Sequence, residues 1–188
     1  LHGGSLPIGH YAAAALARID QRVRGIDMSG FNGGYEQVNS FIRDDIRRNL
    51  VRQTYVETVS SIILENLAER PVDILICMAQ APLTPRALLE LRKQGVITVL
   101  WFDEDYLRFT YWKEMAKYYD FVFTIQKGEC IEAIRKAGAG HVHYLPTACD
   151  PEFHTPMKLS PQDLETWGSP VSFVGAGYHN RQQMFAGL

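Results

Sequence analysis

From Asp73 onward, short apolar runs alternate with helical patterns. The runs at 73–79, 96–102, 121–125 and 141–146 are rich in Val, Ile, Leu and Phe, and a helical pattern follows each of the first three. Nearly continuous apolar strands that alternate with helices are typical of a parallel sheet covered on both faces. The sequence therefore predicts an α/β fold, with a Rossmann-like, doubly wound parallel sheet in a three-layer αβα arrangement.

The rest of the chain is less regular. Apolar spacing predicts a helix over 11–19, residues 23–28 resemble a short strand, and residues 29–34, dense in Gly and Asn, predict a loop. Two helical stretches follow, and the second keeps the 3.6-residue period over 51–67. Residues 171–177 predict a further strand that runs into a glycine loop and a helix.

This pattern predicts two domains of unequal length. Residues 1–158 are expected to form the Rossmann-like domain, and residues 159–188 a linker with the first strand and helix of a second domain. The chain opens without Met, and the glycines at its start lack the strand that such a loop usually follows. We therefore expect a fragment of a longer polypeptide.

Charge and cysteine content narrow the class of protein. The 19 basic and 21 acidic residues give a net charge of −2, whereas binding by phosphate neutralisation needs a basic surface, so no nucleic-acid partner is expected. No apolar stretch approaches the ~20 residues of a transmembrane helix. The three cysteines follow neither a disulfide nor a zinc pattern. We expect a cytoplasmic protein without a metal site.

Three acidic residues directly follow the predicted strand 96–102: Asp103, Glu104 and Asp105. Ligands bind parallel sheets at the carboxyl ends of the strands. Carboxylates in that position can cap the next helix, supply a general base or bind a divalent metal. All three interpretations stay open on the residues alone, with Asp103 as the candidate base and Asp105 as a candidate binding residue.

Glycine-rich loops precede both the first and the last predicted helix. Backbone N–H groups at a helix start can bind a phosphate or a sugar hydroxyl, although such a loop is also an ordinary tight turn. The glycine spacing is not the dinucleotide fingerprint, which argues against a nicotinamide cofactor. The candidate binding residues of these loops and helices are Gly3, Gly4, Ser5, His10, Gly175, Gly177 and Arg181.

Taken in order, four segments resemble GT-B glycosyltransferases of the CgeB-like branch, which is named for a spore maturation protein. The resemblance is carried by GGSLPIGHYAAAALARI, DILICMAQAPLTPRALLELRKQGVITVLWFDED, YLPTACDPEFHTP and VSFVGAGYHNR. The second segment is similar to the family pattern "lk..gi.tv.wf.D". The third is similar to "N-G-V-D-x-x-x-F-x-P" and departs from it at the Asn-Gly.

The resemblance implies the N-terminal, acceptor-side half of a bacterial transferase that uses a nucleotide-sugar donor and no cofactor. The implied acceptor is a saccharide, a protein or a cell-envelope component. Asp103 would contact or deprotonate its hydroxyl, while Gly3, Gly4 and Ser5 would touch the sugar and diphosphate. Arg181 would help to bind the diphosphate. The fragment alone is expected to be almost inactive, because most of the donor domain is missing.

Two other functions compete with this one. The same fold also serves non-catalytic ligand-binding or interaction modules, because a fold does not determine a function. The Asp-x-Asp spacing of Asp103 and Asp105 also resembles the metal motif of the other large glycosyltransferase class, although the regular succession of parallel strands and helices is not the usual layout of that class.

Overall fold

The computed structural model describes residues 8–173, 175 and 179–186. The chain divides into two compact units, Leu1–Asp150 and Pro151–Leu188. The first unit holds the sheet and its helices, and it ends shortly before the domain boundary expected after residue 158. Among the described residues, no helix is both long enough and apolar enough to cross a membrane.

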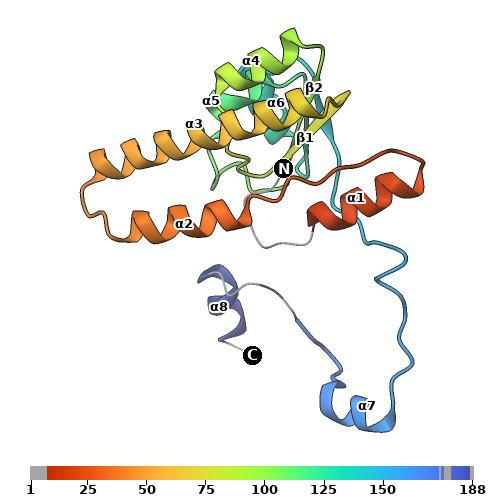
Figure 1. The fold of residues 1–188 in the computed structure, drawn as a ribbon. Helices are drawn as coiled ribbons and strands as arrows, with labels where there is room; N and C mark the ends of the chain where they lie inside the picture. Colours follow the sequence, from red (N-terminus) through yellow and green to blue (C-terminus); the bar gives the residue numbers. More distant parts are fainter. Residues whose placement is uncertain (1–7, 174, 176–178, 187–188) are drawn as a thin grey trace. The chain divides into compact units, whose positions relative to one another are not determined.

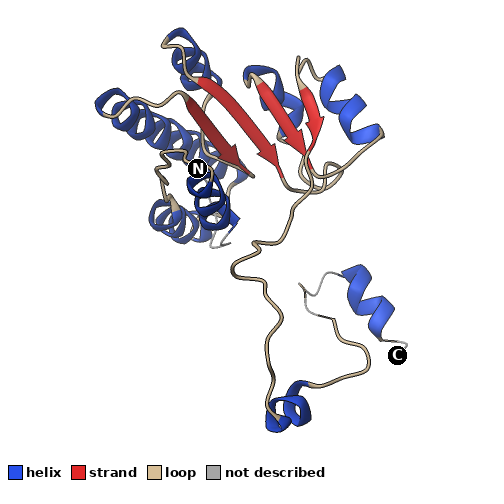
Figure 2. Cartoon of the chain, turned by 90° about the vertical axis from the view of Figure 1, so that its right-hand side faces the viewer, coloured by secondary structure: helices blue, strands red, loops and turns tan. Residues whose placement is uncertain are grey.

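A four-stranded parallel sheet forms the centre of the first unit. Its strands are β1 (Ile74–Met78), β2 (Ile97–Phe102), β3 (Phe121–Thr124) and β4 (Val142–Tyr144), and each lies within one of the apolar runs. The sheet is all-parallel and flanked by helices, which confirms the predicted α/β class and is consistent with a Rossmann-like three-layer fold (Figure 2). Its spatial order, β1-β2-β3-β4, follows the chain without a reversal among the described strands.

Helices connect each strand to the next. They are α4 (Pro85–Lys93), α5 (Trp112–Met115) with the short 3-10 helix η1 (Ala116–Tyr118), and α6 (Glu129–Lys136). Right-handed crossovers between strands in this order place these connecting helices on the same face of the sheet. The helical segment after β2 is short, and residues 106–108 form a turn before it.

The hydrophobic core lies between that face of the sheet and the helices. Alternate strand residues are buried toward it, as the two-residue period of a strand requires. The strand residues are Leu75, Cys77, Thr98, Leu100, Phe102, Val122, Thr124 and Val142. The helices contribute Val59, Ile63, Leu67, Leu88, Leu91, Trp112 and Ile134.

Local sequence signals explain where α4 begins and ends. The Thr84 hydroxyl accepts a hydrogen bond from the Ala87 backbone N–H at 3.1 Å, and Pro85 stands in the first turn. Gly95 has a φ of +83°, a conformation that favours glycine after the end of a helix. These signals place α4 as the sequence predicted.

Three helices precede the sheet: α1 (Ile8–Arg18), α2 (Ser29–Ser40) and α3 (Asp45–Glu69). The last two form an antiparallel hairpin whose loop lies at its outer end, away from the sheet (Figure 1). The Asp44 carboxylate caps α3 by accepting a hydrogen bond from the Arg47 N–H at 2.8 Å. Because its loop lies away from the sheet, the hairpin extends well beyond the sheet (Figure 1).

Two predictions for this region were wrong. Residues 29–34 belong to α2 instead of a loop, and residues 23–28 form no strand apart from an isolated bridge at Asp27. Gly costs about 1 kcal/mol relative to Ala inside a helix, but tertiary contacts can override such a preference. Here the Tyr35 ring stacks on Tyr55 of α3, with ring centroids 4.5 Å apart.

The second unit contains α7 (Pro161–Trp167) and α8 (His179–Phe185). The hydroxyl of Ser160 and the carboxylate of Asp163 form a capping box at the start of α7. The strand expected at 171–177 is not found in its described part, residues 171–173 and 175. A strand needs a partner, and the described residues of this unit include no other strand to pair with it.

Candidate functional site

A cavity of about 550 Å³ lies where β1 and β2 reach their carboxyl ends. This is the edge at which open α/β sheets bind ligands. The walls come from the starts of α1 and of the α4 connection, from the α2–α3 hairpin and from the segment after β2. The lining includes Ile8, Gly9, Asn32, Tyr35, Glu36, Arg52, Tyr55, Val56, residues 78–83, Asp103, Glu104, Tyr111, Met115 and Tyr119.

Asp103 is the first residue after β2, and its side chain lines the cavity. Its Oδ1 is buried and makes no hydrogen bond within the described residues. Burial raises the pKa of this carboxyl, and the backbone groups of Asp103 and Ala79 only partly oppose that effect. The position favours a carboxylate that accepts a proton readily, as a general base does.

Glu104 and Tyr111 place two more polar atoms in the same cavity. The Glu104 Oε2 and the Tyr111 hydroxyl are buried without a hydrogen bond of normal geometry to any described residue. The pKa of Tyr111 is raised above its ordinary range, chiefly by burial, then by the charge of Glu104 and a hydrogen-bonding interaction with its carboxylate, and then by the charge of Asp103. The Tyr111 hydroxyl therefore stays protonated and can donate a hydrogen bond.

Unpartnered buried polar atoms are rare and costly, about 1–3 kcal/mol each. Six such side-chain atoms occur in the described part of the chain, and three of them belong to Asp103, Glu104 and Tyr111. A ligand with several hydroxyl groups would supply the missing hydrogen bonds. The concentration of these atoms in one cavity distinguishes it from an ordinary surface hollow.

The hairpin contributes two aromatic side chains to the lining of the same cavity. Tyr35 and Tyr55 stack at 4.5 Å with an interplanar angle of 21°. Burial, followed by the effects of Tyr35 and Glu36, raises the pKa of Tyr55. The Asn32 amide donates to Glu36 Oε1 at 3.0 Å. The cavity therefore combines stacked rings with hydrogen-bonding groups, a combination that suits a ligand with apolar faces and polar edges.

The other acidic residue of the predicted site behaves differently. Asp105 is not among the lining residues, and its Oδ1 accepts hydrogen bonds from the backbone N–H groups of Leu107 at 2.8 Å and Arg108 at 3.4 Å. This carboxylate stabilises the turn after β2. Asp103 and Asp105 do not converge on one point of the cavity. No cluster of three or more His, Cys, Asp or Glu that could hold a metal ion occurs among the described residues.

The remaining predicted residues fall into three groups. His10 is exposed on α1, beside the lining residue Gly9 but outside the cavity. Gly3, Gly4, Ser5 and Gly177 lie outside the described residues. Gly175 and Arg181 come together in the second unit, where the Arg181 guanidinium lies 5.3 Å from the centre of the Phe173 ring.

Gly175 occupies a confined position in that unit. A Cβ atom there would lie 2.8 Å from Cζ of Phe173 and 3.0 Å from the Arg181 guanidinium. A larger residue would therefore displace the Phe173–Arg181 pair. This explains a local need for glycine without requiring a ligand.

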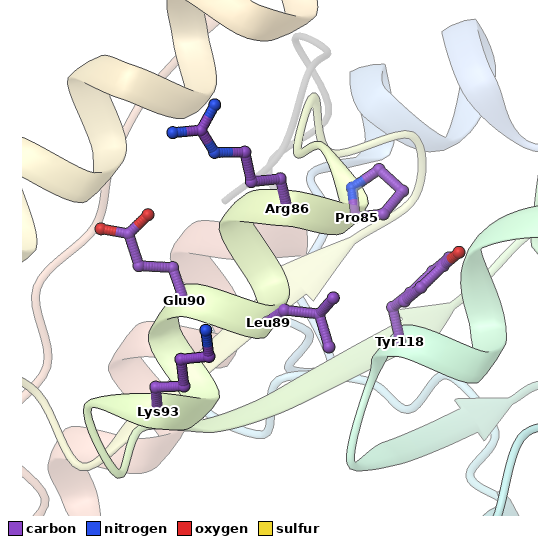
Figure 3. Close-up of a pocket in the computed structure, with 6 residues that line it drawn as sticks. All are labelled: Pro85, Arg86, Leu89, Glu90, Lys93 and Tyr118. Carbon is purple, nitrogen blue, oxygen red and sulfur yellow. The ribbon is translucent and has the colours of Figure 1, made fainter.

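A second hollow, of about 500 Å³, runs along the outer side of α4 (Figure 3). Leu89 points toward Tyr118 across it, whereas Arg86 and Glu90 extend away from Tyr118. None of the buried unpartnered atoms of the described residues belongs to its lining. Its charged side chains include no buried, unpartnered polar atom of the kind that makes the first cavity a candidate site.

Sequence reasoning identified Asp103 but missed much of the site. Glu104 belongs to the same acidic triplet, and its position after an apolar strand was a usable signal. Tyr111, Tyr35 and Tyr55 carry no local signal, because their role depends on how the hairpin packs against the sheet edge.

Comparison with protein-family models, with curated proteins and with solved structures gives no match for this chain.

Proposed function

We propose that this chain is the acceptor-side part of a GT-B-type glycosyltransferase, with the cavity as the acceptor site. One observation carries the proposal: Asp103 presents a buried, unpartnered oxygen with a raised carboxyl pKa at the ligand-binding edge of a parallel sheet. Proton acceptance from a hydroxyl is the chemistry that such a group suits best.

In this proposal Asp103 Oδ1 accepts a hydrogen bond from the acceptor hydroxyl. The hydroxyl oxygen attacks the anomeric carbon of the donor sugar, and its proton passes to Asp103. The bond between the sugar and the nucleotide diphosphate breaks, and the diphosphate leaves with the electron pair. The raised pKa lets the carboxylate hold the proton as the new glycosidic bond forms.

The other groups of the cavity support a carbohydrate acceptor. Glu104 Oε2 can accept and the Tyr111 hydroxyl can donate hydrogen bonds to further sugar hydroxyls. The stacked Tyr35 and Tyr55 rings offer an apolar surface to the C–H face of a sugar ring. A sugar meets both requirements at once.

The donor side of the proposal rests on the second unit and on the resemblance. A nucleotide-sugar donor would be bound there, with Gly175 and Arg181 near its diphosphate. The proposal gives no metal-binding role to Asp105, because its carboxylate is engaged by the turn of Leu107 and Arg108. It places the reaction in a bacterial cytoplasm.

The test compares Asp103→Asn with Asp105→Asn in the complete polypeptide, using UDP- and GDP-sugars, a panel of saccharide acceptors and detection of product by mass spectrometry. Asn keeps the size and hydrogen-bonding capacity of Asp103 but cannot take the proton. We expect turnover to fall roughly a hundredfold to ten-thousandfold in Asp103→Asn and to remain near the original in Asp105→Asn.

Unchanged turnover in Asp103→Asn would remove the general base from the proposal. Acceptor binding by calorimetry without any transfer would instead favour a binding module. Loss of activity in Asp105→Asn, together with loss on adding a chelator, would favour the Asp-x-Asp metal mechanism.

A further inference from the structure

The outer end of the α2–α3 hairpin exposes an unusual group of apolar side chains. The hairpin tip comprises residues 38–52, which include the last turn of α2, the loop and the first two turns of α3. Within it, Val38 is 53%, Phe41 80%, Ile46 80% and Leu50 62% exposed. Single exposed apolar residues are normal, but four within a few turns of one projecting loop mark an interaction surface.

Arginines alternate in sequence with these apolar residues. The tip carries Arg43, Arg47, Arg48 and Arg52 against Asp44 and Asp45, an excess of two positive charges. Both acidic residues are engaged inside the tip: Asp44 caps the helix at the Arg47 N–H, and Asp45 pairs with Arg48 at 2.8 Å. Arg43, Arg47 and Arg52 are exposed. The tip therefore combines exposed apolar side chains with an excess of positive charge.

We infer that this tip docks on an anionic lipid surface. Apolar side chains would enter the boundary between headgroups and acyl chains, and the arginines would contact lipid phosphates. A stable protein interface buries about 1,200–2,000 Å² and takes about 20–30 residues on each side, which four side chains at a narrow loop do not supply. A bilayer needs no matching shape, so a small tip with exposed apolar side chains and excess positive charge is sufficient.

Lipid docking is independent of the proposed function, because it uses none of the cavity residues except Arg52. It has a spatial consequence for the cavity all the same. Tyr35 and Tyr55 line the cavity from the same two helices that end in the tip. Docking would therefore fix the distance between the cavity and the lipid surface.

The experiment is co-sedimentation of the whole chain with vesicles of phosphatidylcholine alone or mixed with phosphatidylglycerol. The variants are Phe41→Ser with Ile46→Ser, and Arg43→Gln with Arg47→Gln. Leu107→Ser is the matched control, since Leu107 is 73% exposed in the same unit but lies outside the tip. Circular dichroism verifies that each variant keeps its helical content, which exposed positions should allow.

We expect binding to the mixed vesicles and little to phosphatidylcholine, with weaker binding as salt is added. The partition coefficient should fall at least about tenfold in the apolar double variant and roughly thirtyfold in the arginine variant. The control should bind like the original chain.

Three results would overturn the inference. They are the absence of binding to mixed vesicles, equal binding to both vesicle types, and binding that neither double variant weakens. Light scattering that shows a dimer, dissociated by the Phe41 and Ile46 substitutions, would assign the tip to a second copy of the chain instead.

Discussion

Gln80 and Glu104 join the loops that follow two neighbouring strands, with the Gln80 Nε2 donating to Glu104 Oε1 at 2.9 Å. Gln80 follows β1 and Glu104 follows β2, and both side chains belong to the cavity lining. The bond fixes one oxygen of the Glu104 carboxylate and leaves the buried Oε2 for another partner. Gln80 is therefore a positioning residue for Glu104.

Gln80→Leu should weaken acceptor binding more than it slows the transfer step. The substitution keeps much of the side-chain volume but removes the N–H that orients Glu104. We expect the acceptor KM to rise severalfold, with a smaller change in kcat, in steady-state assays of the complete polypeptide. Gln80→Glu is the companion variant, because its added negative charge beside Glu104 should raise KM at neutral pH and less so in acid. Equal KM values in the original chain and both variants would contradict this role.

Asp103→Asn should make the fold more stable at neutral pH while slowing the proposed catalysis. Burial raises the pKa of Asp103, so the folded chain retains this proton more strongly than the unfolded chain does. The stability linked to this group is complete below the unfolded pKa and is lost as pH rises through the folded pKa. Thermal melts across the acidic range to neutral pH should show a higher Tm for the variant at neutral pH. A lower Tm there would mean that the ionised carboxylate stabilises the fold, contrary to the raised pKa.

Asp105 should stabilise the turn after β2 and should have no effect on the turnover of the proposed reaction. Asp105→Asn retains an oxygen that can accept from Leu107 and Arg108, and its Tm should stay close to that of the original chain. Asp105→Ala removes the acceptor and should cost about 1 kcal/mol in the free energy of unfolding, measured by urea denaturation. Equal stability of the two variants would show that these hydrogen bonds are dispensable.

Asp120, which precedes β3, forms hydrogen bonds with β2 and an ion pair with α4. Its Oδ2 accepts hydrogen bonds from the Thr98 N–H and hydroxyl, each at 2.8 Å, and Oδ1 lies 2.8 Å from Arg92 Nε. Partial burial alone would raise the pKa of Asp120, but these Thr98 hydrogen bonds and Arg92 lower it overall.

Asp120→Ala should lower the free energy of unfolding by about 1–2 kcal/mol, because Thr98 loses its acceptor. In the original chain, the contribution of Asp120 is present above its unfolded pKa and should be lost as pH falls through the lowered folded pKa. Urea denaturation at neutral and acidic pH tests both statements. If the difference in free energy of unfolding between the original chain and Asp120→Ala persists unchanged in strong acid, the ionised carboxylate is not its cause.

The three cysteines should differ in their reaction with iodoacetamide. Cys77 is fully buried, and burial raises its pKa to about 11, while burial also raises the pKa of Cys130. Cys149 is exposed. Because the thiolate is the reactive form, mass spectrometry of the native chain should find Cys149 alkylated well before the other two. Denaturant should remove the difference, and early modification of Cys77 would show that β1 opens in the native state.

The strands could be predicted because buried parallel strands need unbroken apolar sequence, and few other structures do. The same is true of α4, whose Thr84 cap, Pro85 and Gly95 are local signals. Asp103 could be placed at the ligand-binding edge because its position depends only on where β2 ends. These features follow from short stretches of sequence.

The remaining features depend on contacts between distant segments. Residues 29–34 look like a loop by composition, but α2 forms where Tyr35 stacks on Tyr55. The separation of Asp103 from Asp105 depends on the turn that Leu107 and Arg108 complete. Tyr35 and Tyr55 line the cavity only when the hairpin packs beside the sheet, so no local pattern could reveal this.

The sheet order also bears on how the chain acquires its fold. Because β1, β2, β3 and β4 are neighbours in space in the order in which they occur in the chain, each strand pairs with the one synthesised just before it. The loop closures are short for a parallel sheet, which favours rapid folding. A growing chain can add one strand and one helix at a time to an existing edge, so assembly of this sheet can keep pace with synthesis on the ribosome.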